Sequence, residues 1–325
     1  MFTLLSFFTR IVASAKTFIV VAQLTLLSLC AFNAQSKCLI MVTAGGGHTF
    51  WHATTLGAQK AAIDNGYQII SRGTYESTTA SAQLSIINFF QNYECDGLIL
   101  APNEKSVVDA LVLNYDKPII LIDRKPENSR LPVVKTNDYF AGELAAKQLI
   151  QLSQKTIDLA IVLNNQTEAH LNQRALGFTN LLKQTFSQVK LKHLHSGRSV
   201  GSAREIIFQQ KELIRSAQVV YATNELGSLA LNQDLAEIEN IKIGFDCHPA
   251  LIKATTANKM LGFISQNAFQ IGYASAVKLI NNIESEAPLT SLYLNPMFID
   301  YAFIQKLPEP NCKSIYQYLA HTSTN

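Results

Sequence analysis

Charged and amide side chains follow several apolar runs in this sequence, at the points where those runs end. Asp123 closes one run, Asn224 follows a second and Asp246 follows a third. Parallel strands present their carboxyl ends at one edge of a sheet, where open α/β sheets bind ligands, so these side chains are expected to converge. Carboxylates only accept hydrogen bonds, guanidinium groups only donate them, and amides do both. Such a set, completed by an arginine, suits a ligand rich in hydroxyl groups.

A second source of chemistry is the stretch of residues 37–66. Its apolar start predicts a buried strand, and the small and apolar residues Ala53, Leu56, Gly57 and Ala61 predict a helix lying close on the sheet. Between them, the turn Gly45-Gly46-Gly47-His48-Thr49-Phe50-Trp51 brings two adjacent aromatic rings to the carboxyl end of the strand. These rings are candidate stacking platforms for a sugar.

An enzyme is the competing interpretation of the glycine-rich turn. Backbone N–H groups in such a turn can cradle phosphate, and the turn superficially resembles one found in lipid-linked glycosyltransferases that build cell-wall precursors. However, GxGxxG, GxxxxGK[ST], HExxH and GxSxG are all absent from the sequence. A nucleotide-sugar glycosyltransferase also conflicts with an export signal. We therefore expect no catalytic residue, no cofactor and no metal.

The first 36 residues have the pattern of a signal peptide. Arg10 and Lys16 precede the apolar segment 17–32, and Ala34-Gln35-Ser36 offers a small-x-small cleavage site. The segment is short for a membrane span, although an uncleaved anchor is an open alternative. Removing this peptide leaves 25 basic and 24 acidic residues. A charge this close to zero gives no footprint for nucleic acid, so the expected location is the periplasm and the expected partners are not nucleic acids.

Four cysteines remain beyond residue 36, and they allow three pairings. Cys95 and Cys247 stand beside buried strands and are expected to be small apolar residues. A bridge between Cys38 and Cys312, which would tie down the C-terminal tail, is an open alternative.

Apolar runs alternate with helical patterns through the rest of the chain, which predicts βαβ units. The expected strands are residues 38–44, 67–71, 97–101, 119–123, 133–136, 157–163, 189–195, 219–222, 241–245 and 261–265. Ten strands approach the limit for one twisted sheet, so two sheets of about five, divided near Thr136, are favoured. The clearest helix is 78–93, with Leu84, Ile87, Phe89 and Phe90 on its buried face.

Several segments together resemble a known family, in order and at about its spacing. They are the Phe50-Trp51 pair and residues 96–102, 119–124, 136–142, 174–178, 222–230, 244–246, 264–266 and 270–272. The chain resembles the type I periplasmic binding proteins of the ribose and galactose group, which are related to the autoinducer-2 receptors. The resemblance implies an α/β fold with two flavodoxin-like lobes, a ligand in the cleft, and a hinge of three crossings near Thr136, Gln266 and residues 295–298.

The family pattern also implies domain bounds and ligand contacts. Residues 37–135 with 267–296 would form the N-terminal lobe, and 136–266 with 297–325 the C-terminal lobe and tail. The implied ligand contacts are His48, Phe50, Trp51, Asp123, Arg124, Thr136, Arg174, Asn224, Asp246 and Gln266. His48 is a departure, because family members often carry Asn there.

Structural roles are open alternatives for these residues. They are a surface ion pair for Asp123 and Arg124, helix capping for Arg174 and Asn224, a turn for Asp246, and core packing for Trp51. The function implied is a periplasmic receptor for a small carbohydrate or sugar-like signal, acting as a monomer. Its membrane partner would be an ABC permease, a chemoreceptor or a sensor kinase, and an autoinducer-2-type receptor feeding a sensor kinase is the alternative.

Overall fold

The structure is a computed structural model that describes residues 37–47, 49–74, 79–152, 156–197, 199–234 and 237–322. The expected signal peptide, residues 1–36, and the expected ligand residue His48 lie outside the described residues. Within the described part of the chain, no helix combines the length and the apolar character that crossing a membrane requires.

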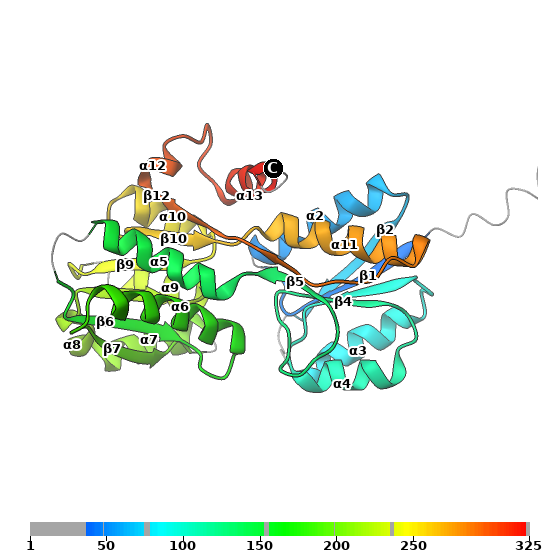
Figure 1. Ribbon diagram of the computed structural model, residues 1–325, viewed down its shortest axis with the longest axis horizontal. Helices are drawn as coiled ribbons and strands as arrows, with labels where there is room; N and C mark the ends of the chain where they lie inside the picture. Colours follow the sequence, from blue (N-terminus) through cyan, green and yellow to red (C-terminus); the bar gives the residue numbers. More distant parts are fainter. Residues whose placement is uncertain are drawn as a thin grey trace, which may run out of the picture. The chain divides into compact units, whose positions relative to one another are not determined.

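The first sheet has six strands in the order β11-β5-β4-β3-β1-β2, all parallel. Its strands are β1 (Cys38–Thr43), β2 (Gln68–Gly73), β3 (Gly97–Leu100), β4 (Ile119–Ile122), β5 (Val133–Thr136) and β11 (Leu292–Leu294). Its helices are α2 (Thr49–Asp64), α3 (Ala80–Gln91), α4 (Lys105–Asn114) and α11 (Ala268–Ser285). They lie on both faces of the sheet, with α2 and α11 on one side and α3 and α4 on the other (Figure 1). Alternate side chains of a strand point to opposite faces. Accordingly, Leu39 and Met41 pack with α2 and α11, while Ile40 and Val42 pack with α3 and α4.

The second sheet repeats this plan in the order β12-β10-β9-β8-β6-β7, with only β12 antiparallel to its neighbour. Its strands are β6 (Leu159–Asn164), β7 (Lys190–His195), β8 (Val219–Ala222), β9 (Ile241–Phe245), β10 (Gly262–Ser265) and β12 (Met297–Asp300). The helices that accompany it are α5 (Asp138–Leu152), α6 (Ala169–Thr185), α7 (Val200–Gln209), α8 (Lys211–Ser216), α9 (Glu225–Asp234), α10 (Pro249–Thr256) and α12 (Tyr301–Ile304). The last helix, α13 (Cys312–Thr322), packs against α11 and α2 of the first sheet. Leaving out β11 and β12, both sheets have the flavodoxin-like order 2-1-3-4-5.

All ten expected strands are present, with ends shifted by two residues at most, but each sheet has a sixth strand that was not predicted. The two additional strands, β11 and β12, are only three and four residues long. Their apolar runs, residues 292–294 and 297–299, are each only three residues long, which is too short to indicate a strand. Both lie where the chain passes between the sheets.

The prediction for helix α3 was right for Ile87 and Phe90 and wrong for Phe89. Ile87 and Phe90 are buried, and Leu84 is half-buried against the same cluster, whereas Phe89 is 51% exposed. The buried face continues through Gln83, whose amide donates to the Ala101 carbonyl at 2.7 Å and accepts from the Asn103 N–H at 2.8 Å. A polar residue therefore occupies the core position that the apolar pattern did not indicate.

Small residues of α2 allow a close helix–helix contact in addition to the expected packing of this helix on the sheet. A Cβ atom on Gly57 would collide with the Phe269 carbonyl of α11, and one on Gly272 with the Thr54 carbonyl of α2. Leu56, expected on the buried face, is exposed. The second sheet has an equivalent pair, in which Gly142 of α5 and Gly177 of α6 contact the backbone of the opposite helix.

Two disulfides replace the expected cysteine arrangement. Cys38 bonds to Cys95 and Cys247 bonds to Cys312. The expectation that Cys95 and Cys247 are unpaired apolar residues was wrong, and so was the alternative Cys38–Cys312 bridge. Cys38 begins β1 and Cys95 stands just before its neighbour β3, which places both thiols at the same edge of the first sheet.

Candidate functional site

Asp123 and Asp246 occupy equivalent positions in the two sheets. Asp123 directly follows β4 and Asp246 directly follows β9. These strands are equivalent, because each is strand 4 in the 2-1-3-4-5 order of its sheet. Both residues have left-handed backbone conformations, with φ values of 61° and 67°, and both are buried. This conformation is uncommon for residues other than glycine and is concentrated at functional sites, where surrounding structure stabilises it. The two carboxylates are thus turned sharply out of their strands.

Gln266 links the ends of the two sheets. It follows β10 of the second sheet, and its Oε1 accepts a hydrogen bond of 2.6 Å from the Thr136 hydroxyl at the end of β5 in the first sheet. Its Nε2 donates to Asp246 Oδ1 at 2.8 Å. The side chains of Thr136, Gln266 and Asp246 therefore form a continuous hydrogen-bonded chain where the polypeptide crosses between the sheets.

Arg174 of α6 joins this chain from the second sheet. Its Nη2 donates to Gln266 Oε1 at 3.2 Å, its Nη1 to the Thr223 carbonyl at 3.0 Å and its Nε to Asp138 Oδ1 at 2.8 Å. Its guanidinium also stacks over the Phe245 ring, 3.8 Å from the centroid. The alternative of a solubilising helix residue was wrong, because Arg174 is buried and every bond it makes is internal.

Burial and neighbouring charges tune these groups. Burial alone would lower the pKa of Arg174, but the Asp138 carboxylate, followed by Asp246 and Asp123, raises the pKa overall. Burial raises the pKa of Asp246 to about 7, with Arg174 opposing that shift and Glu225 adding to it. Asp246 therefore changes charge near neutral pH, which is unusual for a carboxyl group.

Arg124 connects the Asp123 end to the second sheet. Its Nε lies 3.3 Å from Asp123 Oδ2 and its Nη2 lies 3.9 Å from Glu168 Oε2, just before α6. His170 Nε2 lies 3.4 Å from the same Glu168 oxygen. Burial, followed by the positive charges of Arg174 and Arg124, lowers the pKa of His170, so its imidazole is neutral at pH 7. The ion pair that was the alternative role of Asp123 and Arg124 is present, but the aspartate is buried and not at the surface.

Asn224 has the capping role that was one of its two alternatives. Its Oδ1 accepts from the Gly227 N–H at 3.0 Å, at the start of α9. Because the cap engages the oxygen, this role is compatible with a ligand contact through the amide nitrogen, which stays a prediction.

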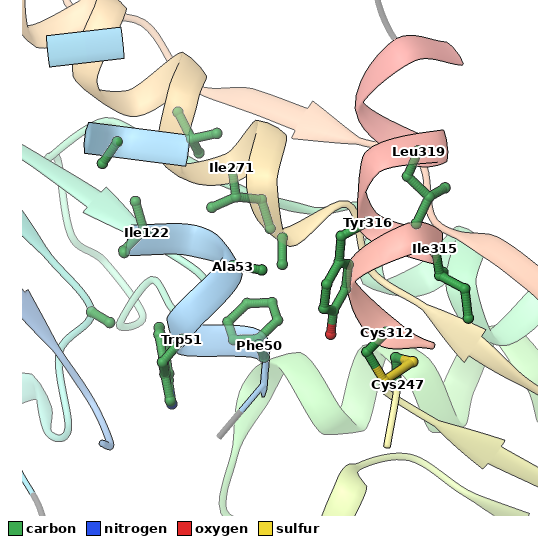
Figure 2. Close-up of a cluster of buried hydrophobic side chains, with 14 of the residues drawn as sticks. Phe50, Trp51, Ala53, Ile122, Cys247, Ile271, Cys312, Ile315, Tyr316 and Leu319 are labelled. Carbon is green, nitrogen blue, oxygen red and sulfur yellow. A yellow bond between two sulfur atoms is a disulfide. The ribbon is translucent and has the colours of Figure 1, made fainter. Parts of the chain in front are cut away.

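The two aromatic rings are buried in this structure. Phe50 is 6% exposed and Trp51 is 8% exposed, with their ring centroids 4.8 Å apart in an edge-to-face arrangement. Both belong to a hydrophobic cluster that includes residues of α10, α11 and α13. In Figure 2, Phe50 lies between Trp51 and Tyr316 of α13. Both rings are therefore core residues in this structure, which is the alternative that was open for Trp51, while a stacking role for either ring stays a prediction.

Several polar residues that surround Arg174 and Asp246 were not predicted. Asp138 forms ion pairs with both Arg174 and Lys135, the latter at 2.6 Å. The charge of Glu225 raises the pKa of Asp246, and the buried His170 has a lowered pKa. Asp138 is the first residue of α5, immediately after the crossing at Thr136, and this placement next to a predicted ligand residue was the available signal. Among the described residues, no three His, Cys, Asp or Glu side chains are placed so that they could hold a metal ion together.

The architecture has close counterparts among solved structures. A glucose-galactose binding protein from Geobacillus stearothermophilus, GanP, has 19% sequence identity and a TM-score of 0.72, over 84% of this chain and 99% of that one. A solute-binding protein from Burkholderia graminis, solved with D-arabinose, has 15% identity and a TM-score of 0.75, over 85% and 99%. One from Actinobacillus succinogenes, with bound D-allose, has 16% identity and a TM-score of 0.73, over 83% and 100%. At these identities the likeness establishes the fold. No curated protein sequence matches the chain significantly.

Two doubly wound sheets, with polar groups meeting where the chain crosses between them, define a two-lobed binding protein of the type I periplasmic fold. Residues 39–287 match the family described as periplasmic binding protein domain, and the chain belongs to this family. It is a binding protein rather than an enzyme, so the glycosyltransferase interpretation has no support.

Proposed function

We propose that the protein is a periplasmic solute receptor that closes over a small carbohydrate or sugar-like signal. The observation that carries this proposal is the hydrogen-bonded chain of Thr136, Gln266, Asp246 and Arg174, which draws side chains from both sheets to one place. Asp123 stands at the equivalent strand end of the other sheet. These groups supply acceptors, donors and one amide that is both, which is the combination that vicinal hydroxyls require.

Binding selects the closed state because only that state lets one ligand contact both lobes. A ligand shifts an open–closed equilibrium by its difference in affinity for the two states. Hydrogen bonds to charged groups are worth about 1.5–3 kcal/mol each, so three or four of them dominate that difference. The crossing segments at Thr136 and Gln266 are the natural hinge, with residues 295–298 as the third crossing.

Solved relatives support the class of ligand. Proteins of the same fold carry D-arabinose and D-allose, and another is a glucose-galactose binding protein. None has a sequence identity that would transfer a particular sugar to this chain. An autoinducer-2-type signal is therefore tested together with the sugars.

Two disulfides support a location outside the cytoplasm, because disulfides persist in oxidising compartments such as the periplasm. The closed receptor would be presented to an inner-membrane partner. An ABC permease is the best supported of these partners, since solved relatives include the periplasmic component of an ABC-type sugar transport system.

The test is a calorimetric titration of the purified protein with D-ribose, D-arabinose, D-glucose, D-galactose, D-allose, myo-inositol and autoinducer-2. We expect one ligand to bind with a Kd in the micromolar range or tighter, and small-angle scattering to show a smaller radius of gyration in its presence. Nucleotide sugars serve as the control and should neither bind nor turn over. Absence of binding across the panel would overturn the proposal.

A further inference from the structure

The C-terminal helix α13 lies beyond the segment that matches the family, which ends at residue 287. Its first residue, Cys312, forms a disulfide with Cys247, the residue directly after Asp246. Near its other end, the Leu319 carbonyl accepts a hydrogen bond of 3.0 Å from the side chain of Asn267, the residue directly after Gln266. Both ends of the helix are thus fastened next to residues of the candidate site.

One face of α13 is buried against the rest of the protein. Cys312, Ile315, Tyr316 and Leu319 recur at helical spacing and are all buried. They join the hydrophobic cluster that contains Phe50 and residues of α11 (Figure 2). The helix therefore packs beside Phe50, one of the two aromatic residues that were predicted to contact the ligand.

Tyr316 is the polar member of this buried face. It is 4% exposed, and its hydroxyl forms no hydrogen bond of normal geometry with a described residue. Thr49 and the Cys247 backbone lie close enough to the hydroxyl to lower its pKa by hydrogen bonding, but no such bond has normal geometry. The Thr49 hydroxyl instead donates to the Cys247 carbonyl at 2.6 Å. Burying a hydroxyl without a partner costs about 1–3 kcal/mol, so such groups are rare unless something else satisfies them.

The burial of Tyr316 and the charges around it determine the protonation state of its hydroxyl. Burial raises the pKa of its hydroxyl, and the nearby carboxylates of Asp246 and Glu225 raise it further. The hydroxyl therefore keeps its proton at neutral pH and acts as a hydrogen-bond donor. A donor beside the carboxylate of Asp246 is complementary to a ligand hydroxyl, which can accept from one group and donate to the other.

We propose that α13 forms a wall of the ligand site and that Tyr316 is a specificity-determining residue, donating from its hydroxyl to the ligand hydroxyl that Asp246 accepts from. The Cys247–Cys312 disulfide is the positioning element, because it holds the turn that precedes Tyr316 beside Asp246. This inference rests on the proposed function, since it needs a hydroxyl-rich ligand.

The first test compares Tyr316→Phe with Tyr318→Phe, which removes an exposed hydroxyl from the same helix. Each variant is titrated with the tightest binder of the sugar panel and with the monodeoxy analogues of that sugar. Loss of one neutral hydrogen bond should weaken binding of the sugar by Tyr316→Phe about 3- to 10-fold. One analogue, lacking the hydroxyl that Tyr316 contacts, should bind Tyr316→Phe and wild type equally. Tyr318→Phe should match wild type with every ligand.

The second test compares two disulfide deletions. The double variant Cys247→Ser/Cys312→Ser should bind the sugar more weakly. It should also no longer discriminate between the sugar and the analogue that lacks the hydroxyl contacted by Tyr316. Cys38→Ser with Cys95→Ser removes the other disulfide, so it should lower thermal stability and leave the Kd unchanged. Unchanged affinity in Tyr316→Phe, or an equal loss with every analogue, would overturn the inference while leaving the receptor proposal intact. A wild-type protein that binds no ligand of the panel would overturn both.

Discussion

At the scale of single residues, the two left-handed aspartates are the most informative feature of the protein. Asp123 and Asp246 are buried and have a left-handed backbone conformation at equivalent points of the two sheets. Each is coupled to an arginine, Asp123 through its contact with Arg124 and Asp246 through the charge of Arg174. A repeated, strained and buried acid is expected where a ligand is held.

Asp246 gives a prediction for the pH dependence of stability. The folded protein raises the pKa of this carboxyl to about 7 and so holds its proton more tightly than the unfolded chain does. The resulting stabilisation is complete below about pH 4 and is lost as the pH rises through about 7, an effect on the order of 4 kcal/mol. Asp246→Asn cannot ionise and should gain stability relative to wild type between pH 5 and pH 8. Urea unfolding of the ligand-free proteins at both pH values measures this, and a constant difference would contradict it.

Arg174 gives a second prediction at this scale. Arg174→Met keeps much of the volume but leaves the Asp138 carboxylate with Lys135 alone, so the free energy of unfolding should fall by about 3 kcal/mol. Arg204→Met is the matched control, because Arg204 pairs with Asp234 at an exposed position. Urea denaturation should show the smaller change for the control. Similar effects of the two substitutions would mean that the buried pair has no special role.

At the scale of elements, paired helices with reciprocal glycines anchor each sheet. Gly57 and Gly272 bring α2 and α11 into backbone contact, and Gly142 and Gly177 do the same for α5 and α6. Because α2 begins at Thr49 and α6 carries Arg174, these contacts also fix the candidate site residues that the helices carry.

The helix contact predicts the effect of adding one methyl group. Gly57→Ala should destabilise the protein by about 1–3 kcal/mol, because its methyl group collides with a backbone carbonyl that cannot rotate away. Gly201→Ala in α7 is the control, since its nearest neighbour, Ser199 Oγ, lies 3.8 Å away. There the higher helix propensity of alanine should stabilise the protein by about 0.5–1 kcal/mol. Thermal unfolding of both variants checks the opposite signs, and a neutral Gly57→Ala would refute the close contact.

At the scale of the whole molecule, two disulfides act in different places. Cys38–Cys95 closes a loop within the first sheet, whereas Cys247–Cys312 fastens the C-terminal helix to the loop after β9. The tail is therefore part of the folded protein and is anchored at the candidate site.

Peptide mapping tests this arrangement directly. Digestion of the non-reduced protein should yield one linked pair of peptides containing Cys38 and Cys95 and another containing Cys247 and Cys312. After reduction, both pairs should separate by mass spectrometry. A peptide linking Cys38 to Cys312 would contradict the fold of the tail.

The sequence by itself was sufficient for ten of the twelve strands in the described part of the chain and for the polar residues at their ends. Buried parallel strands need continuous apolar runs, and a polar residue that stops such a run marks the carboxyl edge of a sheet. That local pattern identified Asp123, Asn224 and Asp246, and the family resemblance added Thr136, Arg174 and Gln266.

Only the tertiary structure decided which groups meet. Asp138 reaches Arg174 across 36 residues of sequence and Gln266 reaches Thr136 across 130, so no local pattern contains either contact. The disulfides, the burial of Phe50 and the placement of Tyr316 likewise depend on the packing of α13. The sequence determines which polar side chains stand at the carboxyl ends of the strands. Long-range packing determines which of these side chains form hydrogen bonds or ion pairs with one another.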